Sequence, residues 1–170
     1  MAEQQVKAGR DVVYDGVLYA VGAALGELAA SEVGQRLAEE LHKSVGRHLA
    51  EYLGKQGVSY DTGATPEDTV RNILTVFLEQ LDFAELEKTE GTPDRGVHGV
   101  WRRIMGLPAY AELAVKYPDP FLSCPLNAVI RQELEKVDHT LKVHGASANV
   151  SESLLESWEE VRPGRRFLTG

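Results

Sequence analysis

The most regular feature of the sequence is a run of large apolar residues at every fourth position between residues 37 and 53. This spacing places side chains along one side of an α-helix, and charged residues occupy the opposite side. Gly54 and Gly57 follow the last apolar residue, as is common at helix C-termini. The pattern predicts an amphipathic helix over residues 33–53. Its stripe is formed by Leu37, Leu41, Val45, Leu49 and Leu53, opposite Glu39, Glu40, Lys43 and Arg47.

The segment before this helix, residues 11–31, is apolar on nearly every side and predicts a second helix that is mostly buried. It contains Gly16, Gly22 and Gly26, and each glycine costs a helix about 1 kcal/mol relative to alanine. Such glycines are tolerated where a backbone or a ligand approaches closely. We therefore expect a tight contact along residues 12–30, within the domain or with another chain.

The rest of the chain predicts a mixture of helices and short strands. Thr65 and Pro66 are typical of a helix start. Residues 150–161 leave two alternatives open, because four of their apolar residues have helical spacing although a strand also fits. Helices are predicted over 65–81, 97–105, 109–117 and 121–138, and strands over 82–90 and 139–148. The fold class is therefore helix-rich α+β, with several packed helices and a small antiparallel sheet. An all-α bundle is the alternative.

Composition limits the domain count and the partners. The chain has 170 residues and a net charge of −8. We expect a single domain over residues 1–170, with a polar N-terminal segment (1–10) and a loose basic tail (162–170). Nucleic-acid binding is not expected, because it needs a concentrated Lys/Arg surface. No segment is apolar enough to span a membrane and none is a secretory signal, so we expect a cytoplasmic protein.

Metal and redox chemistry have little support in the sequence. One cysteine excludes an intramolecular disulfide and a zinc site built from several thiolates. Glu39 and His42 have the Glu-x-x-His spacing of di-iron bundles, but a second copy of that motif is missing. We therefore expect no metal site and name no catalytic residue. The common enzyme motifs are also missing, so a binding role is favoured over catalysis and no cofactor is identified.

Two further residues leave alternatives open. Cys124 lies at the start of the helix predicted over 121–138, where the helix dipole can lower a thiol pKa and favour the thiolate. The alternative is a small apolar residue against the core. His48 lies on the apolar stripe of residues 33–53, where it is either a core histidine with one hydrogen bond or a contact to a ligand or haem.

The segment 97–117 is the richest source of side chains typical of a ligand pocket, which combines apolar walls with a few polar groups. An arginine there could hold a ligand carboxylate. The alternative is a surface helix whose tryptophan packs on the core while its arginines stay solvated. With Cys124 and His48, the candidate ligand-binding residues are His98, Trp101, Arg102, Met105 and Tyr110.

The order of these features resembles the vinyl-reductase-type small-molecule-binding domain, whose α+β fold is shared with subunits of the TRAPP vesicle-tethering complex. The likeness covers roughly residues 30–148 and includes FLSCPLNAVIRQEL and HTLKVHGAS. It implies an apolar or aromatic ligand between helices and sheet, or dimers formed through helices. Cys124 matches a cysteine of the family's late helix, while the cysteines that some members use for a metal have no counterpart. The resemblance implies a closing strand near residues 150–161.

Three functions follow from these observations. The first is a small-molecule-binding sensor or accessory domain with an apolar pocket between helices and sheet. The second is a homodimeric interaction protein or complex subunit without a ligand, paired through the apolar helices 12–30 and 33–53. The third is a haem protein or a cysteine-dependent enzyme.

Overall fold

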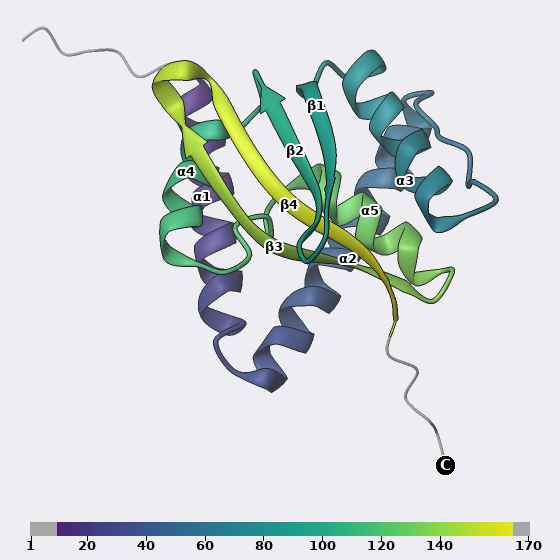
Figure 1. The fold of residues 1–170 in the computed structure, drawn as a ribbon, viewed down its shortest axis with the longest axis horizontal. Coiled ribbons are helices and arrows are strands. Elements are labelled where there is room, and N and C mark those ends of the chain that lie inside the picture. Colours follow the sequence, from purple (N-terminus) through teal and green to yellow (C-terminus); the bar gives the residue numbers. More distant parts are fainter. Residues whose placement is uncertain (1–9, 165–170) are drawn as a thin grey trace, which may run out of the picture.

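The structure, a computed structural model, describes residues 10–164 (Figure 1). Most of the expected helices form close to their expected positions. A π-helical turn, Val76–Gln80, extends the third helix, and a short 3-10 turn, Val150–Glu152, joins the last two strands. The elements in chain order are α1 (Arg10–Leu28), α2 (Glu32–Lys55), α3 (Pro66–Thr75), β1 (Glu85–Thr92), β2 (Gly96–Arg102), α4 (Leu107–Lys116), α5 (Pro125–Glu135), β3 (His139–Asn149) and β4 (Leu154–Pro163).

The strands form one four-stranded antiparallel sheet in the order β1-β2-β4-β3. Two hairpins meet where β2 pairs with β4, with Gly99 opposite Ser157 and Trp101 opposite Leu155. The helices cover one face of this sheet and leave the other open, as Figure 1 shows with the sheet in front. The helix-rich α+β prediction is confirmed, and the all-α alternative is wrong.

The core lies between the inner face of the sheet and the helices behind it. Alternate strand residues such as Trp101 and Leu155 point inward and are buried, as the two-residue period of a strand requires. They meet α4 and α5, which supply the fully buried Tyr110, Leu113, Val129 and Leu134. The largest apolar members of this core include Ile73, Phe77, Tyr110, Leu113, Val129, Leu134 and Leu155.

The structure corrects one sequence-based assignment and decides a second segment that was left open. Residues 97–105 do not form a helix, because 96–102 are strand β2, paired on both sides. The 150–161 segment is not a helix either, since β4 spans Leu154–Pro163, the strand that the family resemblance implied. Pairing across the sheet decided both segments: the indole of Trp101 donates to Ser157 Oγ at 3.0 Å. Such contacts between distant residues override local helical spacing.

The chain ends are described only in part. Helix α1 includes Arg10, the last residue of the expected polar segment, and residues 1–9 lie outside the described residues. Strand β4 includes Arg162 and Pro163, which were expected in the loose tail. That tail assignment began two residues too early. Residues 165–170 also lie outside the described part of the chain.

Helix α2 packs only the end of its large apolar stripe, Leu49 and Leu53, against the core. Leu37, Leu41 and Val45 are about half exposed, at 50%, 45% and 52%. The buried side of α2 is instead a second four-residue series of smaller or polar residues, Gly34, Ala38, His42 and Gly46. A side chain at Gly46 would collide with the backbone carbonyl of Ala128 in α5. The two helices therefore cross at backbone contact, which only small residues permit.

This crossing gives a first prediction, for the variant Gly46→Ala. The new methyl group must push α2 away from α5, and overpacking of this kind costs about 1–3 kcal/mol. We expect urea denaturation to show a corresponding loss in the free energy of unfolding. The matched control is Gly54→Ala in the same helix, where nothing lies within 4 Å of the added carbon. That variant should equal or exceed the wild type, and a Gly46→Ala variant as stable as the control contradicts the packing.

Candidate functional site

An apolar surface on the first two helices is the most unusual feature of the exterior. Val21 of α1 and Leu41 and Val45 of α2 share a shallow hollow of about 650 Å³, with Leu25 and His48 also in its lining. On each helix the stripe continues beyond this hollow at helical spacing. We call the set the α1–α2 face: Val13, Val17, Val21, Val33, Leu37, Leu41, Val45 and Tyr52, which are 42% to 80% exposed.

Two glycines of α1 do not lie on this face, although Ala24 lines its hollow. Gly22 and Gly26 are buried, and a side chain at either position would meet Leu113 or Tyr117 of α4. The close approach expected along α1 is thus made within the domain. The α1–α2 face itself presents large apolar side chains, which water solvates poorly.

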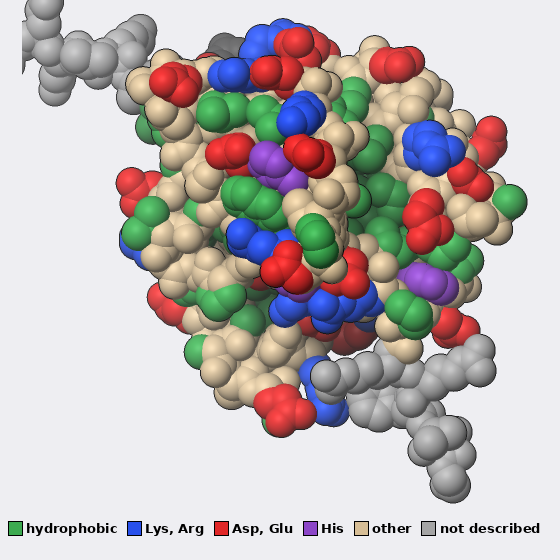
Figure 2. Space-filling view, viewed as in Figure 1, with side chains coloured by type: hydrophobic (Ala, Val, Ile, Leu, Met, Phe, Trp, Pro, Cys, Tyr) green, Lys and Arg blue, Asp and Glu red, His purple; other side chains and the backbone are tan. Residues whose placement is uncertain are grey.

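The open face of the sheet has a different character. Figure 2 shows acidic, basic and histidine side chains interspersed over the strands. His98 stacks on Trp158 with ring centroids 4.7 Å apart, and its Nε2 lies 3.0 Å from a carboxylate oxygen of Glu156. Arg95 also lies over the Trp158 ring. These side chains satisfy one another, so this surface has less to gain from a partner than the α1–α2 face.

The structure does not bring the predicted ligand-binding residues into one hollow. Trp101 and Tyr110 are core residues beneath the sheet, whereas His98 lies on its open face. Arg102 is paired with Glu87 at 2.6 Å.

The other predicted residues are also dispersed. Met105 is 47% exposed, and Cys124 is buried in the core. His48 is exposed on α2 beside Glu51, so it is not the core histidine offered as one alternative. Of all seven predicted residues, His48 alone lines the hollow between α1 and α2.

Cys124 sits where the sequence placed it, as the residue that caps the start of α5. The thiol is buried, and burial raises its pKa to about 11 despite hydrogen bonds from the helix start. The hydroxyl of Tyr110 lies close to the thiol and interacts with it. Because the thiol stays protonated at neutral pH, this geometry gives little support to a nucleophilic cysteine.

A buried polar network joins α2, α5 and the loop before α5, and the sequence analysis missed it. Arg131 of α5 is 5% exposed and donates to Asp119 Oδ2 at 2.6 Å and to His42 Nδ1 at 3.0 Å. His42 lies 3.1 Å from the Cys124 carbonyl oxygen through Nε2. A guanidinium has only donors, so Nδ1 must accept and Nε2–H must donate. The geometry therefore fixes a neutral tautomer of His42.

The pKa values in this network follow from burial and from the charges nearby. Burial lowers the pKa of His42 to about 4, and the neighbouring Arg131 adds to this effect. For Asp119, the attraction and hydrogen bond of Arg131 outweigh its own burial, so its pKa lies below the usual range. An ionised Arg131–Asp119 pair with a neutral His42 is thus the stable arrangement.

A second, partly buried carboxylate lies beneath the sheet. Glu159 of β4 accepts from Asn127 of α5 at 2.7 Å and from Ser157 at 3.2 Å. Burial raises its pKa, which these hydrogen bonds and Arg131 only partly oppose. A signal for Arg131 and Asn127 did exist in the sequence. Both are polar residues inside an apolar helix sequence, but their partners could be found only in the fold.

The structure gives no support to a metal centre at Glu39 and His42. Both ring nitrogens of His42 already have protein partners, and a metal ligand needs one of them. Within residues 10–164, no group of three or more His, Cys, Asp or Glu side chains is placed to hold a metal ion.

Comparisons with known proteins add no identification. No protein-family model, no curated protein and no solved structure matches this chain. The resemblance to the vinyl-reductase-type domain therefore stays a prediction. Among the helices of the described residues, none has the length and apolar character needed to cross a membrane.

The depressed pKa of His42 gives a second prediction. The His42 side chain takes up a proton near pH 6.5 in the unfolded chain but only near pH 4 in the folded chain. The contribution of neutral His42 to the free energy of unfolding is therefore fully present above pH 6.5. It is lost as the pH falls towards 4, by up to about 3 kcal/mol. Urea denaturation at several pH values measures this loss.

The control for this titration is His42→Gln, whose amide can accept and donate but does not titrate. Glu159, with its raised pKa, contributes with the opposite sign in both proteins and therefore cancels in the comparison. The variant should show a shallower decline between pH 6.5 and 4. Equal declines in both proteins rule out a neutral, buried His42 as the cause.

Proposed function

We propose that this chain is an interaction protein that pairs with a second copy of itself through the α1–α2 face. The observation that carries the proposal is the exposure of eight large apolar side chains on two neighbouring helices. Exposed apolar patches on monomeric proteins rarely exceed a few hundred Å², and larger ones mark interaction sites.

The size of the face suits a dimer. If each of its side chains exposes roughly 80 Å², the face offers on the order of 600–700 Å² of apolar surface. A standard interface buries about 800 Å² per partner once its polar rim is included. A stable interface therefore needs little beyond this face and its margin.

The chemistry of the face favours a second copy over a different partner. Its centre, around Val21, Leu41 and Val45, carries no charged side chain, and a charge-depleted apolar centre is typical of homodimers. In a twofold dimer the same patch meets itself, and an apolar surface is complementary to itself without matching charges. The hollow between α1 and α2 can receive apolar side chains of the partner copy.

The small-molecule sensor remains a prediction with less support. Its proposed residues are dispersed between the core, the open face of the sheet and α2, as described above. The third alternative, a cysteine-dependent enzyme or haem protein, is disfavoured by the protonated, buried Cys124. For a haem, the sequence indicated His48 as the contact, and this side chain lies exposed beside Glu51.

Size-exclusion chromatography with light scattering tests the dimer and gives a third prediction. The wild type should have twice the mass of the 18.7 kDa chain. Val45→Glu should be monomeric, because an unpaired buried charge costs several kcal/mol, or about a hundredfold or more in Kd. A wild type that is monomeric at high concentration overturns the proposal.

The matched control is Val115→Glu on α4. Val115 is 87% exposed and lies outside the α1–α2 face, so its substitution adds the same charge to a different surface. This variant should stay dimeric. If both substitutions release monomers, the α1–α2 face is not the interface. Circular dichroism of Val45→Glu should remain that of the wild type, since the substituted position is already half exposed.

A further inference from the structure

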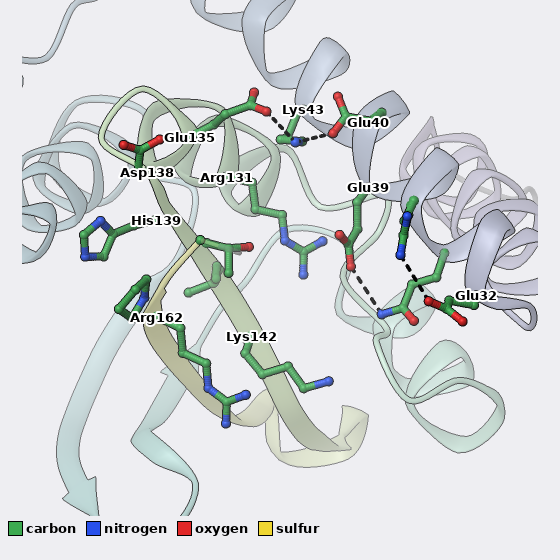
Figure 3. Close-up of a pocket in the computed structure, with 16 residues that line it drawn as sticks. Glu32, Glu39, Glu40, Lys43, Arg131, Glu135, Asp138, His139, Lys142 and Arg162 are labelled. Atoms are coloured by element: carbon green, nitrogen blue, oxygen red, sulfur yellow. Dashed lines mark hydrogen bonds and ion pairs between the residues drawn. The ribbon is translucent and has the colours of Figure 1, made fainter. Parts of the chain in front are cut away.

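A polar cleft lies on the other side of α2 from the apolar face. Its volume is about 770 Å³, within the range of small-molecule sites. The first half of α2 forms one wall, the C-terminal end of α5 the floor, and the start of β3 with the end of β4 the opposite wall (Figure 3). Side chains from segments far apart in the sequence therefore meet around one space.

Some of the acidic side chains at the margin of this cleft have cationic partners. Glu40 and Glu135 both pair with Lys43. Glu32 pairs with Arg36 at 3.1 Å, and Glu39 accepts a hydrogen bond from Gln35 at 3.3 Å. Lys43 serves two carboxylates and Gln35 is uncharged, so the margin stays acidic. Over the whole lining the five carboxylates are balanced by five Lys and Arg side chains: Glu32, Glu39, Glu40, Glu135 and Asp138 against Arg36, Lys43, Arg131, Lys142 and Arg162.

The inner part of the cleft presents cationic donors. Figure 3 shows Arg131 reaching into it from α5, with Lys142 of β3 and Arg162 of β4 on the opposite wall. His42 and Asp119 hold Arg131 through one N–H at each terminal nitrogen. Its remaining N–H groups have no hydrogen-bond partner among the described residues, and Lys142 has no ion pair there.

These donors are arranged before any ligand arrives. The Arg131 guanidinium is buried and fixed in orientation, so little side-chain entropy is lost when it accepts a further partner. Its planar set of N–H groups matches carboxylate and phosphate oxygens, and an ammonium group such as Lys142 adds a point charge. Arg162 already pairs with Glu160 at 2.7 Å and contributes less.

We propose that this cleft binds a small molecule through an anionic head group, a carboxylate or a phosphate, held between Arg131 and Lys142. The site is separate from the proposed dimer interface, because the cleft and the α1–α2 face use different sides of α2. A dimer formed through that face leaves the cleft open. Failure of one proposal therefore does not decide the other.

The experiment titrates the wild-type chain with inorganic phosphate and with citrate, at an ionic strength held constant with sodium chloride. Two-dimensional NMR of backbone amides should show shifts centred on Thr140, Leu141 and Lys142. A rise in melting temperature beyond that in sodium chloride alone should accompany them. If neither anion gives cleft-centred shifts or stabilisation at about 10 mM, the proposal is overturned, because even a Kd of about 1 mM would be detected.

Charge variants make the fourth prediction. Lys142→Gln should weaken binding about fivefold, the effect of losing one exposed charge contact. Its matched control is Lys88→Gln on β1, which removes the same charge from a lysine paired with Glu90 outside the cleft. That control should bind like the wild type. Equal losses in both variants mean nonspecific attraction of anions and overturn the site.

The sign of the effect at Glu39 separates an anionic ligand from a zwitterionic one. Glu39 lies on the α2 wall and interacts electrostatically with Arg131. Glu39→Gln removes a negative charge facing the donors, so it should tighten binding of phosphate and citrate. Weaker binding in this variant contradicts the proposal, because it shows that the carboxylate itself holds the ligand. Arg131 is left unchanged, since its removal would also break the buried network.

Discussion

The contact between α2 and α5 governs the rest of the structure. At Gly46 the two helices meet at their backbones, and one turn away His42 joins the Cys124 carbonyl to Arg131. Backbone contact leaves no space for large side chains on that side of α2. The large apolar residues of α2 must therefore lie elsewhere on the helix, and this leaves Leu37, Leu41 and Val45 half exposed at the surface.

The same contact explains why α2 has three different sides. One side is small and packs on α5, one is apolar and shares the α1–α2 face, and one is polar and lines the cleft. A helix with three sides shows a clear four-residue period in its sequence, although the period does not report which side is buried. The apolar series from Leu37 to Leu53 and the buried series from Gly34 to Gly46 have the same spacing.

The sequence predicted the fold class and most helices, because caps and periodicity are local. Thr65 accepts from the Asp68 amide at 3.1 Å, as its position predicted. The strand over 96–102 was missed and the segment 150–161 was left open, because the two strands pair with each other across more than 50 residues, with Trp101 bonded to Ser157. The residues of the candidate site could not be predicted for the same reason. Arg131 gains its role from His42 and Asp119, which no local pattern connects to it.

Arg131 links the buried network to the cleft, and this connects stability with ligand binding. Asp119 and His42 restrict the guanidinium so that its outer N–H groups face the cleft. An anion bound there would favour the ordered arrangement of Arg131 and thereby the α2–α5 contact, because a ligand that binds only the folded chain stabilises it. Protonation of His42 has the reverse effect. It adds a buried positive charge beside Arg131 and removes the acceptor that fixes it, so acid weakens the helix contact and the anion site together.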